Sequence, residues 1–155
     1  MKVARRLIRA RRGVAALEFA LVMPVLLIML GGVVDFGLVM LARSQLASAV
    51  TQGAEYAMAT GSSVSPSSIR TMVQSASPLA GVTATVTPSS GAACYCVTGT
   101  PLALSSHICT SACPDGSSPG VYLTIKAQYT YQPILPFYSA LAATTLSEQA
   151  QVRLQ

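Results

Sequence analysis

Charged residues are scarce in this chain of 155 residues, and histidine is scarcer still. Charged side chains make up 10% of the sequence, hydrophobic residues make up 52%, and there is one histidine. So little charge beside so much apolar surface excludes a disordered segment and leaves room for about one domain. The sequence also has no internal repeat, no glycine-rich phosphate loop and no paired carboxylates. We therefore expect no enzyme, no cofactor and no small-molecule substrate.

The basic residues are concentrated at the N-terminus. Six of the ten lysines and arginines lie in the first twelve residues, and removing residues 1–13 leaves four basic residues against five acidic ones. The remainder therefore carries a net charge of −1, which removes the main support for nucleic-acid binding by the folded part. The local cluster instead predicts a cytoplasmic N-terminus for the membrane segment that follows.

A long apolar run comes after the basic cluster. Residues 19–34 contain no charge, and apolar residues resume after Asp35 and continue to Ala42. As a helix rising about 1.5 Å per residue, this run would extend about 36 Å, against a hydrocarbon core of about 30 Å. The sequence therefore predicts a membrane-spanning helix over residues 14–43. We expect Asp35 to mark the outer membrane interface.

The helical pattern continues beyond the membrane and then gives way to alternation. Apolar residues at three- and four-residue spacing predict one helix from near Val14 to Thr60. A second, short helix is predicted to begin at a Ser-Pro pair and to cover residues 66–76. Period-two alternation predicts strands over 82–87, 121–131 and 146–154, with one more short strand around 92–97.

These elements predict an α+β fold. An antiparallel sheet of three or four strands, laid against the outer half of the long helix, would let each cover the apolar face of the other. One residue departs from the pattern, because Glu148 falls on the apolar side of the last strand.

Four cysteines lie in the polar stretch 88–120: Cys94, Cys96, Cys109 and Cys113. Outside the cytoplasm, an oxidising compartment favours two disulfides. Because a bond between Cys94 and Cys96 is locally awkward, we expect each to pair with Cys109 or Cys113, and the choice stays open. A zinc site would need reduced thiols, so no metal is expected. Without a Cys-x-x-Cys motif, no thiol-redox site is expected either.

The single histidine does not predict a catalytic site. His107 lies beside Ser105 and Ser106, and Asp115 is the one acid near it in sequence. A serine nucleophile needs a base and an orienting acid in a fixed geometry, which sequence proximity alone does not provide. We therefore expect no catalytic residue here.

A small residue and a carboxylate mark the start of the apolar run. The basic leader ends at Gly13, and Glu18 lies five residues later, directly before Phe19. A charge in a membrane helix costs about 2.5–3.5 kcal/mol at the centre and less near the interface, so Glu18 needs a partner. Cleavage after Gly13 would supply one, because it creates an amine on Val14, one helical turn before Glu18.

This segment resembles the processing site of type IV prepilins. The run from Arg12 to Leu27 more closely resembles the N-terminal signature of TadE-like proteins, which are minor pseudopilins of the tight-adherence (Flp) pilus system. Residues 129–137 and 145–153 are similar to that family's C-terminal region. Where the family often has Glu-Phe-Gly-Arg, this chain has Asp35-Phe36-Gly37-Leu38, so no role of that arginine carries over. The length of this chain favours a TadE-like protein over the shorter Flp pilins and the longer TadG-type proteins. Length distinguishes TadE-like from TadF-type proteins poorly.

The resemblance implies a pilin-like fold in three parts: a basic prepilin leader (1–13), a transmembrane helix (14–43) and a periplasmic domain (44–155). It also implies a single-pass protein of the bacterial inner membrane with a cytoplasmic N-terminus. A prepilin peptidase would cut between Gly13 and Val14 before Glu18 and Phe19 take part in assembly. The implied partners are the membrane, that peptidase, other pilins and pseudopilins, and the Tad secretion machinery.

The rival interpretation is an ordinary signal sequence. Ala47-Ser48-Ala49 matches a small-residue cleavage site, and cleavage there would release a secreted periplasmic binding domain that begins at Val50. A signal sequence that is retained would instead leave the binding domain anchored. Against this, the apolar region of a secretory signal has about 7–15 residues. The run in this chain extends from Val14 past Leu41 and contains a charge.

Overall fold

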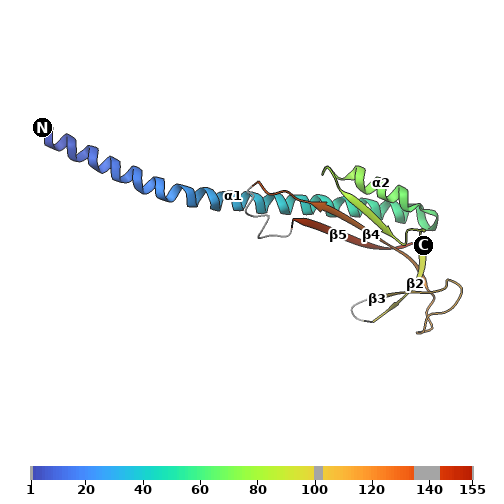
Figure 1. The fold of residues 1–155 in the computed structure, drawn as a ribbon. Coiled ribbons are helices and arrows are strands. Elements are labelled where there is room, and N and C mark those ends of the chain that lie inside the picture. Colours follow the sequence, from blue (N-terminus) through green and yellow to red (C-terminus); the bar gives the residue numbers. More distant parts are fainter. Residues whose placement is uncertain (1, 100–102, 135–143, 155) are drawn as a thin grey trace.

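The fold is built on one long helix. The computed structural model describes residues 2–99, 103–134 and 144–154, and over residues 2–13 it describes the backbone alone. Helix α1 (Lys2–Thr60) begins twelve residues before the expected start at Val14. The difference has a local cause, because the alanine, arginine and leucine that dominate this leader are strong helix formers. The N-terminal part of α1 projects alone from the rest of the molecule (Figure 1).

Helix α1 changes character along its length. Most large apolar side chains between Val14 and Leu41 are exposed, whereas apolar residues beyond them are buried at intervals of three or four. The buried positions are Ala42, Leu46, Ala49, Val50, Ala54 and Ala57. The rest of the domain packs on this outer half, as the apolar stripe in the sequence predicted.

A short turn and a second helix follow α1. The 3₁₀ segment η1 (Gly61–Ser63) ends the long helix, and α2 (Pro66–Ala76) has the bounds that the sequence predicted. Its proline occupies the first turn, where a missing N–H costs no hydrogen bond. Helix α2 packs alongside α1 (Figure 1) and buries Ile69 and Val73.

Five antiparallel strands form one sheet in the described part of the chain. They are β1 (Thr83–Thr87), β2 (Ala93–Thr98), β3 (Ala103–Ser106), β4 (Gly120–Thr130) and β5 (Thr145–Leu154). Strand β4 is central: β5 pairs along one edge, β1 and β2 share the other, and β3 extends the sheet beyond β2. The expected three or four strands are thus corrected to five. Strand β3 was missed because it is short, mostly exposed and without apolar alternation.

The core lies between the two helices and one face of the sheet. Alternate residues of β4 and β5 face α1, among them Leu123, Ile125 and Val152, and β1 contributes Ala84 and Val86. Apart from the buried Gly120 at the start of β4, the intervening residues of these strands are exposed or half-buried. A long helix packed on an antiparallel sheet confirms the predicted α+β class.

Two disulfides fasten the region around β2 and β3. Cys94 bonds to Cys109, and Cys96 bonds to Cys113. Cys94 and Cys96 are buried in β2, while their partners lie in the segment between β3 and β4. The structure thus confirms that each early cysteine pairs with a later one, and it resolves the pairing that the sequence left open.

Gly53 is a point of close approach between α1 and α2. A methyl group at this position would collide with the Cγ2 methyl group of Val73. Gly53→Ala should therefore destabilise the outer domain by about 1–2 kcal/mol, because overpacking costs about 1–3 kcal/mol and outweighs the ~1 kcal/mol that alanine gains in a helix. Thermal unfolding of the full chain in detergent, followed by circular dichroism, measures the change.

The matched control for this prediction is Gly37→Ala. Nothing lies within 4 Å of a methyl group added at Gly37, so the melting temperature should stay the same or rise. An equal loss of stability in the two variants would contradict the close contact between the helices.

Candidate functional site

The candidate residues at the start of the apolar run lie on the projecting half of α1. Gly13 is helical, and the side chains of Val14, Glu18 and Phe19 are exposed. Since residues four apart share one side of a helix, Glu18 lies one turn above Val14 on the same side. This surface is uncovered by any other part of the chain that the structure describes.

The surroundings of Glu18 are almost entirely apolar. It is the one ionisable residue between Val14 and Val34. Along this stretch, large apolar side chains are exposed on every side of the helix. A helix that is apolar on every side requires lipid or other apolar helices around it. Among the described residues, this helix is the one long and apolar enough to cross a membrane, by length and composition.

The next charged residue along α1 is buried. Asp35 is 5% exposed, and its Oδ1 accepts two hydrogen bonds from the segment that follows β4. The hydroxyl of Tyr131 donates at 3.0 Å, and the backbone N–H of Ile134 donates at 2.8 Å. The sequence predicted that Asp35 marks the outer membrane interface. The structure adds that its carboxylate fastens the sheet to the helix.

Tyr131 is suited to be a permanent donor to this carboxylate. Burial of its side chain, followed by the hydrogen bond to Asp35, raises the pKa of the Tyr131 hydroxyl above its ordinary value. A raised pKa means that the hydroxyl keeps its proton throughout the neutral range. The Tyr131 hydroxyl therefore remains a donor to Asp35.

A second contact joins β5 to α1. Nε of Arg43 donates to Oε1 of Glu148 at 2.8 Å, which explains why a charged residue occupies the apolar side of β5. The two side chains are 55% and 29% exposed, respectively. An ion pair this accessible to water contributes about 0.2–1 kcal/mol. Its main effect is therefore to orient β5 against the helix.

Both contacts hold the same end of the sheet. Asp35 and Arg43 are about 12 Å apart along the helix at its usual rise. Their partners follow the end of β4 and lie near the start of β5, where α1 leaves the domain (Figure 1). We call these two contacts the helix–sheet clamp.

The histidine and the nearby acid contact different serines. Nε2 of His107 lies 3.0 Å from the carbonyl oxygen of Ala112 and 3.1 Å from Oγ of Ser111. Asp115 instead accepts hydrogen bonds from the backbone N–H and hydroxyl of Ser117. The described residues contain no group of three or more metal-ligating side chains. The geometry of a serine–histidine–acid triad is therefore not assembled by these contacts.

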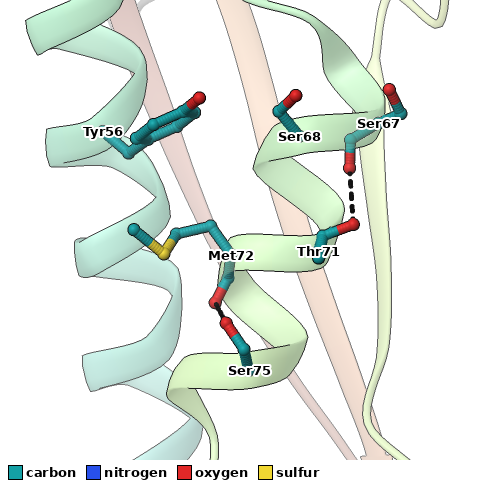
Figure 2. Close-up of a pocket in the computed structure, with 6 residues that line it drawn as sticks. All are labelled: Tyr56, Ser67, Ser68, Thr71, Met72 and Ser75. Carbon is teal, nitrogen blue, oxygen red and sulfur yellow. Dashed lines mark hydrogen bonds between the residues drawn. The ribbon is translucent and has the colours of Figure 1, made fainter.

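A hollow of about 390 Å³ lies between α1 and α2 (Figure 2). It is lined by Tyr56, Ser67, Ser68, Thr71, Met72 and Ser75. The hydroxyls of Thr71 and Ser75 donate to the carbonyl oxygens of Ser67 and Met72 within α2. The lining contains no carboxylate, amine or thiol, so it offers hydroxyl groups and one aromatic ring but no acid–base pair.

Helix α1 matches a known protein family. Residues 13–55 fit the family model described as TadE-like protein. Over these residues the helix is similar to that family. The matched range begins at Gly13, includes Glu18 and Asp35, and ends within the buried part of α1. None of the curated proteins and none of the solved structures compared with this chain gives a significant match.

The TadE-like match confirms the N-terminal resemblance and leaves the C-terminal one untested. Residues 129–137 and 145–153 lie outside the matched range. Of these, residues 135–137 also lie outside the part of the chain that the structure describes. The structure nevertheless gives Tyr131, within that segment, a contact with the TadE-like helix.

The contacts that connect helix and sheet could not be predicted from the sequence. Glu148 departs from the alternation of the last strand, but its partner Arg43 lies 105 residues away. Tyr131 lay in a segment noted for its resemblance, yet no local pattern links it to Asp35, 96 residues earlier. The folded structure is therefore needed to identify Arg43 as the partner of Glu148 and Tyr131 as the partner of Asp35.

Breaking the clamp at Asp35 should loosen the domain. Asp35→Ala should cost about 2–4 kcal/mol, because the Tyr131 hydroxyl and the Ile134 N–H lose a charged acceptor. Tyr131→Phe should cost about 1.5–3 kcal/mol alone and much less when Asp35 is already alanine. A double-mutant cycle on the full chain in detergent, measured by denaturant unfolding, gives this coupling.

The exposed ion pair is the control for this cycle. Glu148→Gln should cost less than about 1 kcal/mol, because water screens the pair. Strictly additive effects of the Asp35 and Tyr131 substitutions would show that their hydrogen bond does not hold the domain together.

Proposed function

We propose that this protein is a membrane-anchored minor pseudopilin that a prepilin peptidase cuts after Gly13. The mature chain then takes part in assembling a Flp-type pilus. The observation that carries this proposal is the TadE-like match over residues 13–55, on a helix that exposes large apolar side chains from Val14 to Leu41. Such a protein acts through contacts of this helix and requires no active site.

The position of Glu18 supports cleavage after Gly13. In the cut chain Val14 carries a new α-amine, one helical turn from the Glu18 carboxylate. Either charge alone in hydrocarbon is costly, so the two stabilise each other. Because the Glu18 side chain is exposed, it can pair with an amine of its own chain or of a neighbouring subunit.

The charge distribution and the disulfides support one membrane orientation. The basic leader favours a cytoplasmic N-terminus, which places residues 44–155 in the periplasm. Two disulfides form readily in that oxidising compartment. The partners in this scheme are the inner membrane, the prepilin peptidase, other pilins and pseudopilins, and the Tad secretion machinery.

The packing of α1 argues against the rival signal sequence. A cut before Val50 would remove Ala42, Leu46 and Ala49, and the last two are completely buried in the core. It would also remove Asp35 with its hydrogen bonds to the end of the sheet. A domain released in this way would expose the apolar face of the sheet, so a secreted binding domain is the weaker proposal.

Glu18→Val should separate processing from assembly. The substitution removes the one charge between Val14 and Val34, so membrane insertion should become easier, while Gly13 keeps its basic and small-residue context. The mutant should be cut and stable but unable to support piliation, because the Val14 amine loses its partner. Immunoblotting for the processed form, beside counts of surface pili in cells carrying only the mutant, measures both effects.

Glu55→Val provides the matched control. Glu55 is an exposed glutamate in the outer half of the same helix, and its replacement should leave both processing and piliation intact. Normal piliation with Glu18→Val would show that Glu18 is passive. Uncleaved Glu18→Val protein would instead assign this residue to recognition by the peptidase.

A further inference from the structure

The face of the sheet turned away from the helices carries positive charge and no carboxylate. In β1, β4 and β5 its side chains are threonine, serine, glutamine, one tyrosine and two cations, Lys126 and Arg153. The acids of the outer domain lie elsewhere. Glu55 is on α1, Glu148 is clamped to the helix, and Asp115 is in the segment before β4. The face is therefore complementary to a polar, negatively charged ligand.

Arg153 is the centre of a built recess at one end of this face. The floor is Gly120, where an added Cβ atom would lie 3.1 Å from Nε of Arg153 and would press into the ring of Tyr122. The guanidinium carbon of Arg153 lies 5.9 Å from the centroid of that ring. Glycine thus allows both side chains to rest against the backbone of β4.

Arg153 lines two hollows. One, of about 370 Å³, is lined by Tyr95, Ser117 and Ser118, besides the Tyr122 ring. The other, of about 490 Å³, is lined mainly by residues 119–121 and the end of β5. A ligand held by Arg153 would therefore meet aromatic rings and hydroxyl groups on one side.

Arg153 forms no ion pair with the residues that the structure describes. Arg43, in contrast, is paired with Glu148. Asp115, close in sequence to the lining residues, accepts the hydroxyl and N–H of Ser117, and these bonds lower the pKa of its carboxyl group. That carboxylate is thus already satisfied within its own turn, and the N–H groups of Arg153 are available to a ligand.

We propose that the Arg153 recess binds a carboxylate-bearing sugar of an acidic polysaccharide. A guanidinium group binds a carboxylate through two parallel hydrogen bonds. The tyrosine rings supply apolar surface for the C–H face of a sugar, and the serine hydroxyls can donate to or accept from its hydroxyl groups. From this recess the polymer would run toward Lys126, which lies about 13 Å farther along β4 than Tyr122 at the usual strand rise.

A nucleic acid fits this face less well. Two cations would neutralise about two phosphates, which is too few for the counterion release that supplies most of the affinity for nucleic acids. A uronic acid polymer carries less charge and many hydroxyl groups. The threonine, serine and glutamine side chains of the face match that chemistry. The proposal is independent of pilus assembly and does not require it.

The test is titration calorimetry on the full chain in detergent with a galacturonic acid trimer. The acidic trimer should bind, and the neutral galactose trimer should bind at least about ten-fold more weakly, because only a carboxylate pairs with the guanidinium. Arg153→Gln should weaken the binding of the acidic trimer by about ten-fold or more. Arg153→Lys keeps the charge but loses the paired N–H groups, so its loss should be intermediate.

Arg70→Gln is the matched control, because it removes the same charge from α2 instead of the sheet. It should leave the affinity unchanged, and circular dichroism verifies the fold of each variant. Failure of the acidic trimer to bind, equal binding of the neutral trimer, or equal losses from Arg70→Gln and Arg153→Gln would overturn the proposal. Tighter, Arg153-dependent binding of a DNA duplex would assign the recess to nucleic acid and overturn it as well.

Discussion

Helix α1 is one continuous helix whose two parts have different surroundings. From Val14 to Leu41 it exposes large apolar side chains, and from Ala42 onward it buries apolar residues under the sheet and α2. The outer domain depends on this shared helix, because the sheet covers an apolar stripe of the same helix. The projecting part of α1 and the outer domain therefore form one structural unit, not two units joined by a flexible linker.

Asp35 lies close to the position where these environments meet. A buried carboxylate is costly unless its charge is satisfied, and the segment after β4 satisfies it with a hydroxyl and a backbone N–H. The same hydrogen bonds hold that end of the sheet against the helix. The Arg43–Glu148 pair adds a weaker contact on the accessible side. The hydrogen bonds that the buried Asp35 carboxylate requires thus also fix the position of the domain on α1.

Periodicity explains which parts of the fold could be predicted from the sequence. The outer half of α1, helix α2 and strand β4 each bury one face, so their apolar residues repeat with the period of the element. Strand β3 buries little of its side-chain surface, so its sequence shows no apolar alternation. For the cysteines, spacing disfavoured a bond between Cys94 and Cys96 but could not choose their partners, since that choice depends on how the later segment folds back on β2. The contacts of Asp35 and Arg43 span about a hundred residues, and no local pattern encodes them.

Mass spectrometry on protein from cells with an active prepilin peptidase identifies the N-terminal residue of the mature chain and so shows whether α1 is cut after Gly13. A cut there leaves the shared helix whole from the apolar run to the core, and the expected mature chain begins at Val14. A chain that begins at Met1 would show that no processing occurs. A chain that begins at Val50 would show that the helix is severed within the domain core. Either result would contradict processing after Gly13.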